Sequence, residues 1–129
     1  MSRKIKAIRG AIKVSENTKE SISSATIRLL RSIIEANNLE ICDIISIFFT
    51  MTTDLNADFP ARAAREVCGP SVPLLCAQEI EVTGSMPGVI RVLIHAETPL
   101  EGTETKHIYL DGAEQLRPDL FEKGESNER

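Results

Sequence analysis

The chain has 129 residues, of which 42% are hydrophobic and 26% are charged. This length fits one domain with one hydrophobic core, and the composition is that of an ordinary globular protein. The formal net charge of −4 argues against a nucleic acid or an anionic membrane as partner, so any anion site must be built locally by a few cationic side chains.

Targeting and redox features are few. No hydrophobic run has the length of a signal peptide or of a membrane span, so we expect a cytoplasmic protein. The three cysteines, Cys42, Cys68 and Cys76, are odd in number and lack a CxxC spacing, which argues against a disulfide framework and a zinc site. With only two histidines in the chain, we expect no catalytic metal.

A strand and a helix are predicted at the N-terminal end. Lys4 to Ala11 has the pattern of a strand, and Gly10 near its end allows a neighbouring backbone or side chain to approach closely. Residues 17–20 predict a helix start, with a polar cap at Asn17 and a glutamate three positions later. Apolar residues at helical spacing from Ile22 to Ile34 predict that this helix packs on the core.

A second strand and a second helix follow. Ile41 to Thr52 predicts a strand so uniformly apolar that both of its faces should be covered. Phe59 to Val67 predicts a short helix on which Arg62 and Arg65 share one face. These two arginines either form an exposed basic face, with Arg62 paired to Glu66, or belong to a site.

Two further strands are predicted in the C-terminal half. Val72 to Cys76 contains Pro73, which places this strand at a sheet edge or in an irregular ladder. Val89 to Ala96 is a β-branched run typical of a sheet strand. The remaining predictions are a polar loop over residues 98–105, a last short strand over Lys106 to Leu110, a terminal element over Leu116 to Leu120 and a flexible tail over residues 122–129. The folded domain would therefore span residues 1–121.

The strand of residues 89–96 carries a cation. Because side chains alternate along a strand, the apolar residues at positions 90, 92 and 94 share one face. Arg91, Leu93 and His95 share the other face. A guanidinium on a largely apolar face costs stability unless an anion meets it. Arg91 could reach the sheet edge, pair with an internal carboxylate, or bind an anionic ligand.

Several strands and two helices in one small domain predict an α/β or α+β architecture, with a single mixed sheet and helices on one face. The second apolar face of such a sheet must also be buried. In a chain of this length the cover that we expect is another copy of the chain, in a closed homo-oligomer with sites at the subunit boundaries.

The chain lacks the motifs of nucleophilic and nucleotide-dependent enzymes, such as a GxSxG elbow, a P-loop or a GxGxxG fingerprint. Cys76 fits a buried small hydrophobe better than a catalytic thiol. The remaining candidates are five arginines, one acid and one phenol: Arg9, Arg62, Arg65, Arg91, Arg117, Glu79 and Tyr109. Such a set suits binding and polarising a small polycarboxylate without proton transfer or a covalent intermediate.

Seven segments together resemble a known family. They are Ile8-Arg9-Gly10-Ala11, the stretch from Asp54 through Phe59-Pro60-Ala61 to Arg65-Glu66, Val72-Pro73 with Cys76 to Glu79, Val82-Thr83-Gly84, Ile90-Arg91-Val92, His107-Ile108-Tyr109-Leu110 and Leu116-Arg117-Pro118-Asp119-Leu120. They occur in order across almost the whole chain. As an ordered set they resemble the monofunctional chorismate mutases of the AroH type, a class of small trimeric α/β-barrel proteins.

This resemblance implies an isomerase that converts chorismate to prephenate, by a Claisen rearrangement, in phenylalanine and tyrosine biosynthesis. It implies that no cofactor or metal is used, because bonds break and form in one pericyclic step. The enzyme holds the folded conformer of chorismate and meets charge where it develops. The resemblance also implies a homotrimer that forms a pseudo α/β barrel, with active sites between subunits.

The resemblance further implies a role for each site residue. Arg91 would donate to the ether oxygen, and Glu79 would accept from the ring hydroxyl. Arg9 would bind the side-chain carboxylate with help from Tyr109. The rest of the implied site is Phe59, Ala61, Arg62 and Arg65 from the neighbouring subunit, Leu74, Leu75 and Cys76 in the pocket lining, and Leu116 and Arg117 over its mouth.

Two residues depart from the family pattern. Arg62 stands where lysine is frequent, which keeps the charge but changes its reach. Leu75 stands where threonine is common, so a polar contact is lost and affinity is expected to be weaker.

Two other functions fit the arginine set. A non-catalytic trimeric protein that binds a dicarboxylate metabolite would need the same cations. An imine deaminase of the RidA type, which has a similar trimeric fold, would also use an arginine clamp, although its glycine-rich segments are not found in this sequence.

Overall fold

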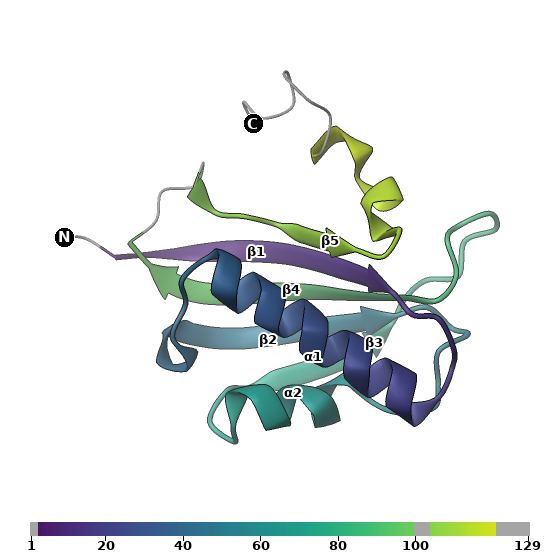
Figure 1. Ribbon diagram of the computed structural model, residues 1–129, viewed down its shortest axis with the longest axis horizontal. Helices are drawn as coiled ribbons and strands as arrows, with labels where there is room; N and C mark the ends of the chain where they lie inside the picture. The colour runs from purple at the N-terminus through teal and green to yellow at the C-terminus, as the bar shows by residue number, and fades with distance from the viewer. Residues whose placement is uncertain (1–2, 100–103, 121–129) are drawn as a thin grey trace.

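The computed structural model describes residues 3–99 and 104–120 (Figure 1). The helices and strands in chain order are β1 (Lys4–Lys13), α1 (Lys19–Ala36), β2 (Ile44–Met51), α2 (Pro60–Cys68), β3 (Leu74–Gln78), β4 (Val89–Thr98) and β5 (Ile108–Leu110). Short 3-10 helices are η1 (Ile41–Asp43), η3 (Ala113–Leu116) and η4 (Pro118–Leu120). The predicted tail at 122–129 and part of the predicted loop at 98–105 lie outside the described residues.

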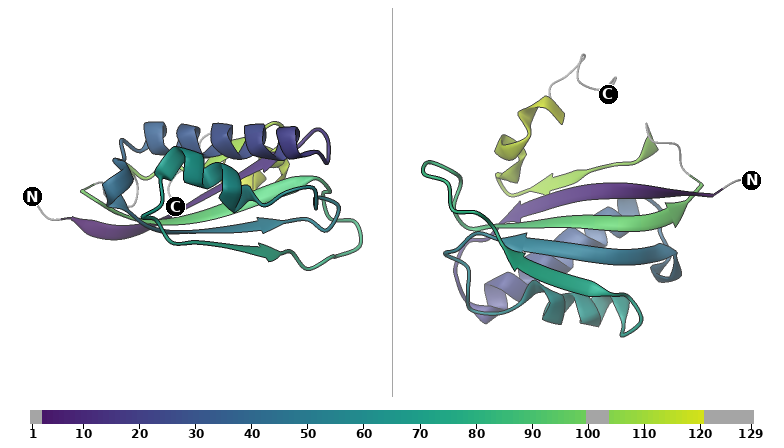
Figure 2. Two further views of the ribbon diagram at one scale, coloured as in Figure 1. Left: turned by 90° about the horizontal axis from the view of Figure 1, so that it is seen from below. Right: turned by 180° about the vertical axis from the view of Figure 1, so that it is seen from behind.

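The strands form one five-stranded mixed sheet in the order β3-β2-β4-β1-β5. The long central strands β1 and β4 are antiparallel, as are β2 and β4, whereas β3 and β5 each run parallel to their neighbour. Helices α1 and α2 lie side by side on one face of the sheet (Figure 2). This arrangement confirms the predicted α+β class, the single mixed sheet and the helices on one face. The strand predicted over Val72 to Cys76 is present as β3, which begins just after Pro73 and lies at an edge as predicted.

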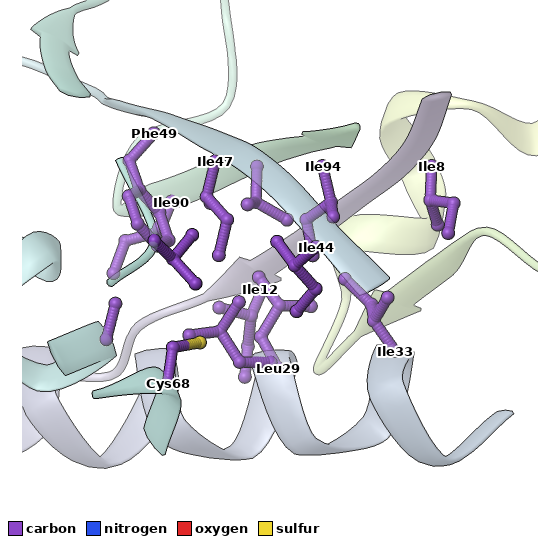
Figure 3. Packing of buried hydrophobic residues seen from close by; sticks show 14 of the residues in the cluster. Ile8, Ile12, Leu29, Ile33, Ile44, Ile47, Phe49, Cys68, Ile90 and Ile94 are labelled. Atoms are coloured by element: carbon purple, nitrogen blue, oxygen red, sulfur yellow. The ribbon is translucent and has the colours of Figure 1, made fainter. Parts of the chain in front are cut away.

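The main core fills the space between the helices and the sheet (Figure 3). From β4 it takes Ile90, Val92 and Ile94, each at most 4% exposed, as the alternation predicts. Leu29 and Ile33 of α1 are fully buried against them. Burying side chains of this size contributes about 1.5–3 kcal/mol each, so the covered face of the sheet supplies most of the stability of the chain.

The first helix begins one residue later than the sequence pattern indicates. Its cap is Thr18, whose Oγ1 accepts a hydrogen bond from the backbone N–H of Ser21 at 3.0 Å. Asn17 is therefore not the cap. Its Oδ1 instead accepts from the backbone N–H groups of Asn56 and Ala57, both at 3.0 Å, and so ties the start of α1 to the loop before α2.

The second strand differs from its prediction in two ways. Residues 41–43 form the 3-10 helix η1 rather than strand, because Asp43 and Glu40 close a capping box before β2 begins at Ile44. The face of β2 that points away from the helices is not covered within one chain, since Ile45 is 44% and Phe48 42% exposed. The cover that we expect for this face is another copy of the chain, and that stays a prediction.

A smaller apolar cluster covers one end of the other sheet face. It joins Ala11 of β1 and Val89 of β4 to Tyr109 of β5 and Ala113 of η3, and Leu116 packs against it. The predicted terminal element at 116–120 is thus present as η3 and η4, and it is anchored to the sheet beside Tyr109.

Gly10 allows β1 to lie close under α1. An added Cβ would be 2.7 Å from Cδ1 of Ile33 and 3.0 Å from the carbonyl oxygen of Ile108. We expect Gly10→Ala to lower the free energy of unfolding by about 1–3 kcal/mol, as overpacking does elsewhere. Urea denaturation followed by circular dichroism measures this change. Ala7→Ser, which adds one atom at an exposed position of the same strand, is the control and should leave stability unchanged.

Candidate active site on the second face of the sheet

The sheet face opposite α1 and α2, here called the second face, gathers most of the predicted site. The strand register places Arg91 between Thr50 of β2 and Ala11 of β1, and Tyr109 of β5 lies next to Ala11. Arg9, two positions before Ala11, is a diagonal neighbour of Arg91 on the same face, at a spacing of about 7–8 Å. Two guanidinium groups from adjacent strands therefore share one surface.

Arg91 is held by a carboxylate. Its Nε lies 2.9 Å from Oε2 of Glu79, and the same Glu79 oxygen accepts a hydrogen bond from Thr50 Oγ1 at 2.6 Å. The Glu79 side chain is 16% exposed and that of Arg91 is 45% exposed, so the guanidinium still meets solvent. The internal carboxylate that could offset Arg91 is therefore present, and it fixes the direction of Arg91.

Two polar residues of this face were not predicted from the sequence. Thr50 is a partner of Glu79, and the alternation of β2 places it opposite Arg91. His107 lies beside Arg9, whose backbone N–H donates to His107 Nδ1 at 3.0 Å. For Thr50 a signal existed, because it is one of only two polar residues in the otherwise apolar strand β2. For His107 none existed, because its partner is almost a hundred residues away.

The C-terminal segment borders this cationic surface. Leu116 packs on the cluster that contains Tyr109, and the Arg117 guanidinium forms two hydrogen bonds to the carboxylate of Asp119, at 2.9 and 2.6 Å. Hydrogen bonding to Asp119 raises the pKa of Arg117. One chain therefore brings together Arg9, Glu79, Arg91, Tyr109, Leu116 and Arg117.

The other predicted residues gather along α2 and the edge strand β3. Phe59, Arg62 and Cys76 line a cleft of about 430 Å³. Phe59 is 62% exposed although it is a large apolar residue. Arg62 pairs with Asp58, with its Nε 2.9 Å from Oδ1, and not with Glu66. The hydrogen bond from Arg62 lowers the pKa of Asp58.

Cys76 belongs to this second group. It packs partly against the main core, and burial raises the pKa of its thiol, opposed by a hydrogen bond from the Ala61 backbone and by the charge of Arg65. Leu74 also packs against the core, whereas Leu75 is 60% exposed and lies on the second face opposite Phe48. Cys76 is thus a shielded, weakly acidic thiol next to cations, and not an activated nucleophile.

The two groups are separated within one chain. Helix α2, which carries Ala61, Arg62 and Arg65, lies on the covered side of the sheet (Figure 2), whereas Arg9 and Arg91 lie on the opposite side. The sheet therefore stands between them. A ligand that contacts both groups would need the α2 and β3 edge of one copy next to the second face of another.

A larger hollow lies elsewhere, at the start of α1. Its volume is about 800 Å³, and its walls include Lys13, Arg28, Asp54 and Asp111. Arg28 is paired with Asp111 through two hydrogen bonds, the longer at 3.0 Å, and Asp54 accepts the backbone N–H of Gly88. Because its cations are matched by its own carboxylates, this hollow is a poorer anion site than the second face, in spite of its volume.

Within residues 3–99 and 104–120, no helix is long and apolar enough to span a membrane. The same residues contain no cluster of three or more histidine, cysteine, aspartate or glutamate side chains that could hold a metal ion.

The fold and the site define a small α+β protein that presents cations on a sheet face for a polyanionic ligand. A family model described as chorismate mutase type I matches residues 5–120. The chain therefore belongs to the chorismate mutase type I family, a family of isomerases. The predicted resemblance to the AroH-type mutases is confirmed.

Individual relatives agree with this family. Chorismate mutase AroH of Thermus thermophilus is 45% identical over 117 residues, covering 90% of this chain and 96% of the relative. Chorismate mutase AroH of Bacillus subtilis is 41% identical, covering 90% and 92%. A solved chorismate mutase from Clostridium thermocellum superimposes with a TM-score of 0.83 at 49% identity, covering 84% of this chain and 97% of that one.

The three thiols should differ in reactivity. Cys42 is exposed, whereas burial raises the pKa of both Cys68 and Cys76 and so lowers their thiolate fraction at pH 8. We expect iodoacetamide to alkylate Cys42 first, and peptide mass spectrometry measures the order. Cys42→Ser should remove the fast phase. Alkylation of Cys76 at the rate of Cys42 would contradict the shielded environment described above.

Proposed function

We propose that this chain converts chorismate to prephenate, without cofactor or metal, in a site completed by two copies of the chain. In this reaction the ether carbon–oxygen bond breaks while a carbon–carbon bond forms, in one step without proton transfer. Negative charge builds on the ether oxygen and positive charge on the ring. The observation that carries the proposal is the pair of guanidinium groups, Arg9 and Arg91, on one rigid sheet face in a chain of this family.

Arg91 would donate to the ether oxygen. It sits in the middle of β4, between two paired strands, and the ion pair to Glu79 restricts its rotamers. A cation held in place before the reaction stabilises developing negative charge without a reorganisation cost. Arg91 is therefore the main electrostatic contributor in this proposal.

Arg9 would bind the side-chain carboxylate of chorismate, and Tyr109 would assist it from β5. Leu116 and Arg117 would close the mouth of the site. Arg117 is partly exposed and pairs with Asp119, two positions further along the chain. Because an exposed ion pair of this kind is weak, the Arg117 side chain can turn toward a ligand. Closure by such a segment excludes water and strengthens the electrostatic contacts inside the site.

Glu79 would have two roles. Its contact to Arg91 orients the guanidinium, and its carboxylate would accept from the ring hydroxyl and offset the cationic ring. Thr50 supports both roles because it donates to the same Glu79 oxygen at 2.6 Å. A carboxylate held by two donors keeps its position when the ligand arrives.

The second copy would supply the group along α2 and β3. Phe59 would form an apolar wall of the pocket, and Ala61 would contribute backbone atoms to it. Arg62 and Arg65 would add positive charge next to the dianionic substrate. Leu74, Leu75 and Cys76 would line the pocket, with Cys76 near the hydroxyl end. This division follows from the separation of the two groups by the sheet, since one chain cannot present both to one ligand.

The same proposal includes a closed homotrimer in the cytoplasm. Ile45, Phe48 and Leu75 leave apolar surface on the second face, between 42% and 60% exposed. Burial of these side chains against other copies would remove that surface from water. The trimer would then form the pseudo α/β barrel and complete each site at a subunit boundary.

Loss of chorismate absorbance, with prephenate formed in equal amount, tests the proposed reaction directly. A trimeric binding protein would bind chorismate without turnover, and a RidA-type deaminase would release ammonia from an imine. Family membership favours the mutase over both. Purified protein that leaves chorismate unchanged would overturn the proposal.

Arg91→Ala should lower kcat/KM by about 10²–10³-fold or more, the range for loss of a donor to a developing oxyanion. Arg91→Lys should also inactivate, because an ammonium cannot reproduce the guanidinium pair with Glu79. Steady-state kinetics and sedimentation measure activity and assembly, and the assembly should not change. Arg31→Ala, at an exposed position of α1, is the control and should keep full activity. Near-normal activity of Arg91→Ala would remove Arg91 from the mechanism.

Arg65→Ala should also inactivate the enzyme, because it removes a cation from the second group. When the Arg65 and Arg91 variants are denatured, mixed and refolded, some interfaces combine an intact α2 group with an intact second face. We expect a part of the activity to return in this mixture and none in either variant refolded alone. If the mixture stays inactive although mass spectrometry shows mixed oligomers, the shared site is wrong.

A further inference from the structure

His107 contacts Arg9 at both its backbone and its side chain. The backbone N–H of Arg9 donates to His107 Nδ1 at 3.0 Å, and the terminal nitrogen Nη2 of Arg9 lies 3.5 Å from Nε2 of the same ring. The sheet pairs Gly10 with Ile108, so His107 occupies the place where the next rung of the β1–β5 ladder would be. The imidazole accepts a backbone donor there in the way that a carbonyl does in a regular strand.

This hydrogen bond determines the tautomer of the ring. Nδ1 must be unprotonated in order to accept, so in neutral His107 the proton is on Nε2. Nε2 therefore cannot accept from the Arg9 guanidinium, and the 3.5 Å approach is a packing contact between ring and guanidinium. His107 therefore restricts the conformation of the Arg9 side chain without accepting a hydrogen bond from its guanidinium. The guanidinium N–H groups stay available for a carboxylate.

Asn37 holds the backbone that carries His107. Its side-chain Nδ2 donates to the carbonyl oxygen of Lys106 at 3.0 Å, and its Oδ1 accepts from the backbone N–H of Lys106 at 2.7 Å. Nδ2 also donates to the carbonyl oxygen of Ile33 in α1 at 2.9 Å. Asn37 is 1% exposed, so breaking these bonds would leave a buried amide unpaired. The residue before His107 is thus fixed to the end of α1.

We propose that His107, held in place by Asn37, is a positioning residue that fixes the guanidinium of Arg9 for the substrate carboxylate. The inference rests on the proposed role of Arg9 and adds the group that preorganises it. A charged donor whose position is set before binding loses less conformational entropy when it meets the ligand. His107 itself does not touch the reacting atoms in this proposal.

The charges around His107 make its function depend on pH. It faces Arg9 from β1 and Arg117 from the segment after η3, and Arg117 is paired with Asp119. Burial first, and then the charges of Arg9 and Arg117, lower the pKa of His107 below its ordinary value of 6.5. Protonation would turn Nδ1 into a donor that opposes the Arg9 N–H. The contact is therefore intact at neutral pH and is lost as the pH falls through the lowered pKa.

Two substitutions separate positioning from a structural role. His107→Asn keeps an acceptor in the place of Nδ1 but does not titrate, whereas His107→Phe keeps the ring shape and removes the acceptor. We expect His107→Phe to raise KM for chorismate about tenfold with kcat changed less than about threefold, because ground-state and transition-state binding of the carboxylate are weakened alike. His107→Asn should keep KM within about threefold of wild type at pH 7.5.

The pH profile gives a second readout that does not depend on how well His107→Phe folds. In the wild type, KM should rise as the pH is lowered below about 6.5, and this rise should be absent in His107→Asn. Equal KM values for wild type and His107→Phe, or the same acid rise in His107→Asn, would overturn the proposal. If His107→Phe does not fold, the profile of His107→Asn decides.

Arg9→Ala and the double variant with His107→Phe distinguish this inference from the proposed function. If His107 acts through Arg9, the KM of the double variant should be no higher than that of Arg9→Ala alone. An Arg9→Ala variant with unchanged KM would refute the role of Arg9 itself. Raised KM in Arg9→Ala with additive effects in the double variant would refute only the positioning by His107.

Discussion

The alternation of side chains along β4 is the constraint on which the rest of this structure depends. Its apolar face is buried under α1 and supplies the centre of the core, while the opposite face carries Arg91. A guanidinium on that face is tolerated because Glu79 meets it at 2.9 Å and because half of its side chain remains in water. One strand thus provides stability on one side and a rigid cation on the other.

The sheet also acts as a partition. Its strand order places β4 and β1 next to each other, so Arg91 and Arg9 lie on adjacent strands. Strand β3 lies at the edge of the sheet, and α2 lies on the opposite, covered face. In the proposed trimer each site combines the arginines of the second face of one copy with the α2 and β3 group of another copy. Within one copy, Arg9 and Arg91 are therefore kept apart from Arg62 and Arg65, which reduces the repulsion among these four charges.

In the proposed site, small polar contacts around the arginines provide the preorganisation. Thr50 holds Glu79, Glu79 holds Arg91, and His107 lies against Arg9. A reaction without proton transfer needs no acid or base with a shifted pKa. The protein can instead contribute charged side chains that are held in a fixed orientation toward the substrate. Asn37 extends this support to the end of α1, where an element of the core holds a residue at the edge of the site.

Local pattern in the sequence determined the strands, both helices, the two faces of β4 and the candidate arginines, because periodicity and residue type report directly on burial. The predictions from this pattern were wrong where two neighbouring residues or two local structures competed. Thr18 rather than Asn17 caps α1, and η1 takes the place of the predicted start of β2. Only the tertiary structure decided that Arg62 pairs with Asp58, that Thr50 contacts Glu79 and His107 contacts Arg9, and that the sheet separates the two groups of candidate residues. The contacts of Thr50 and His107 and the separation of the two groups depend on strand order and register, which bring together residues distant in sequence. The Arg62 pair is local, but helical spacing offers Asp58 and Glu66 equally, four residues to either side, so the sequence does not choose between them.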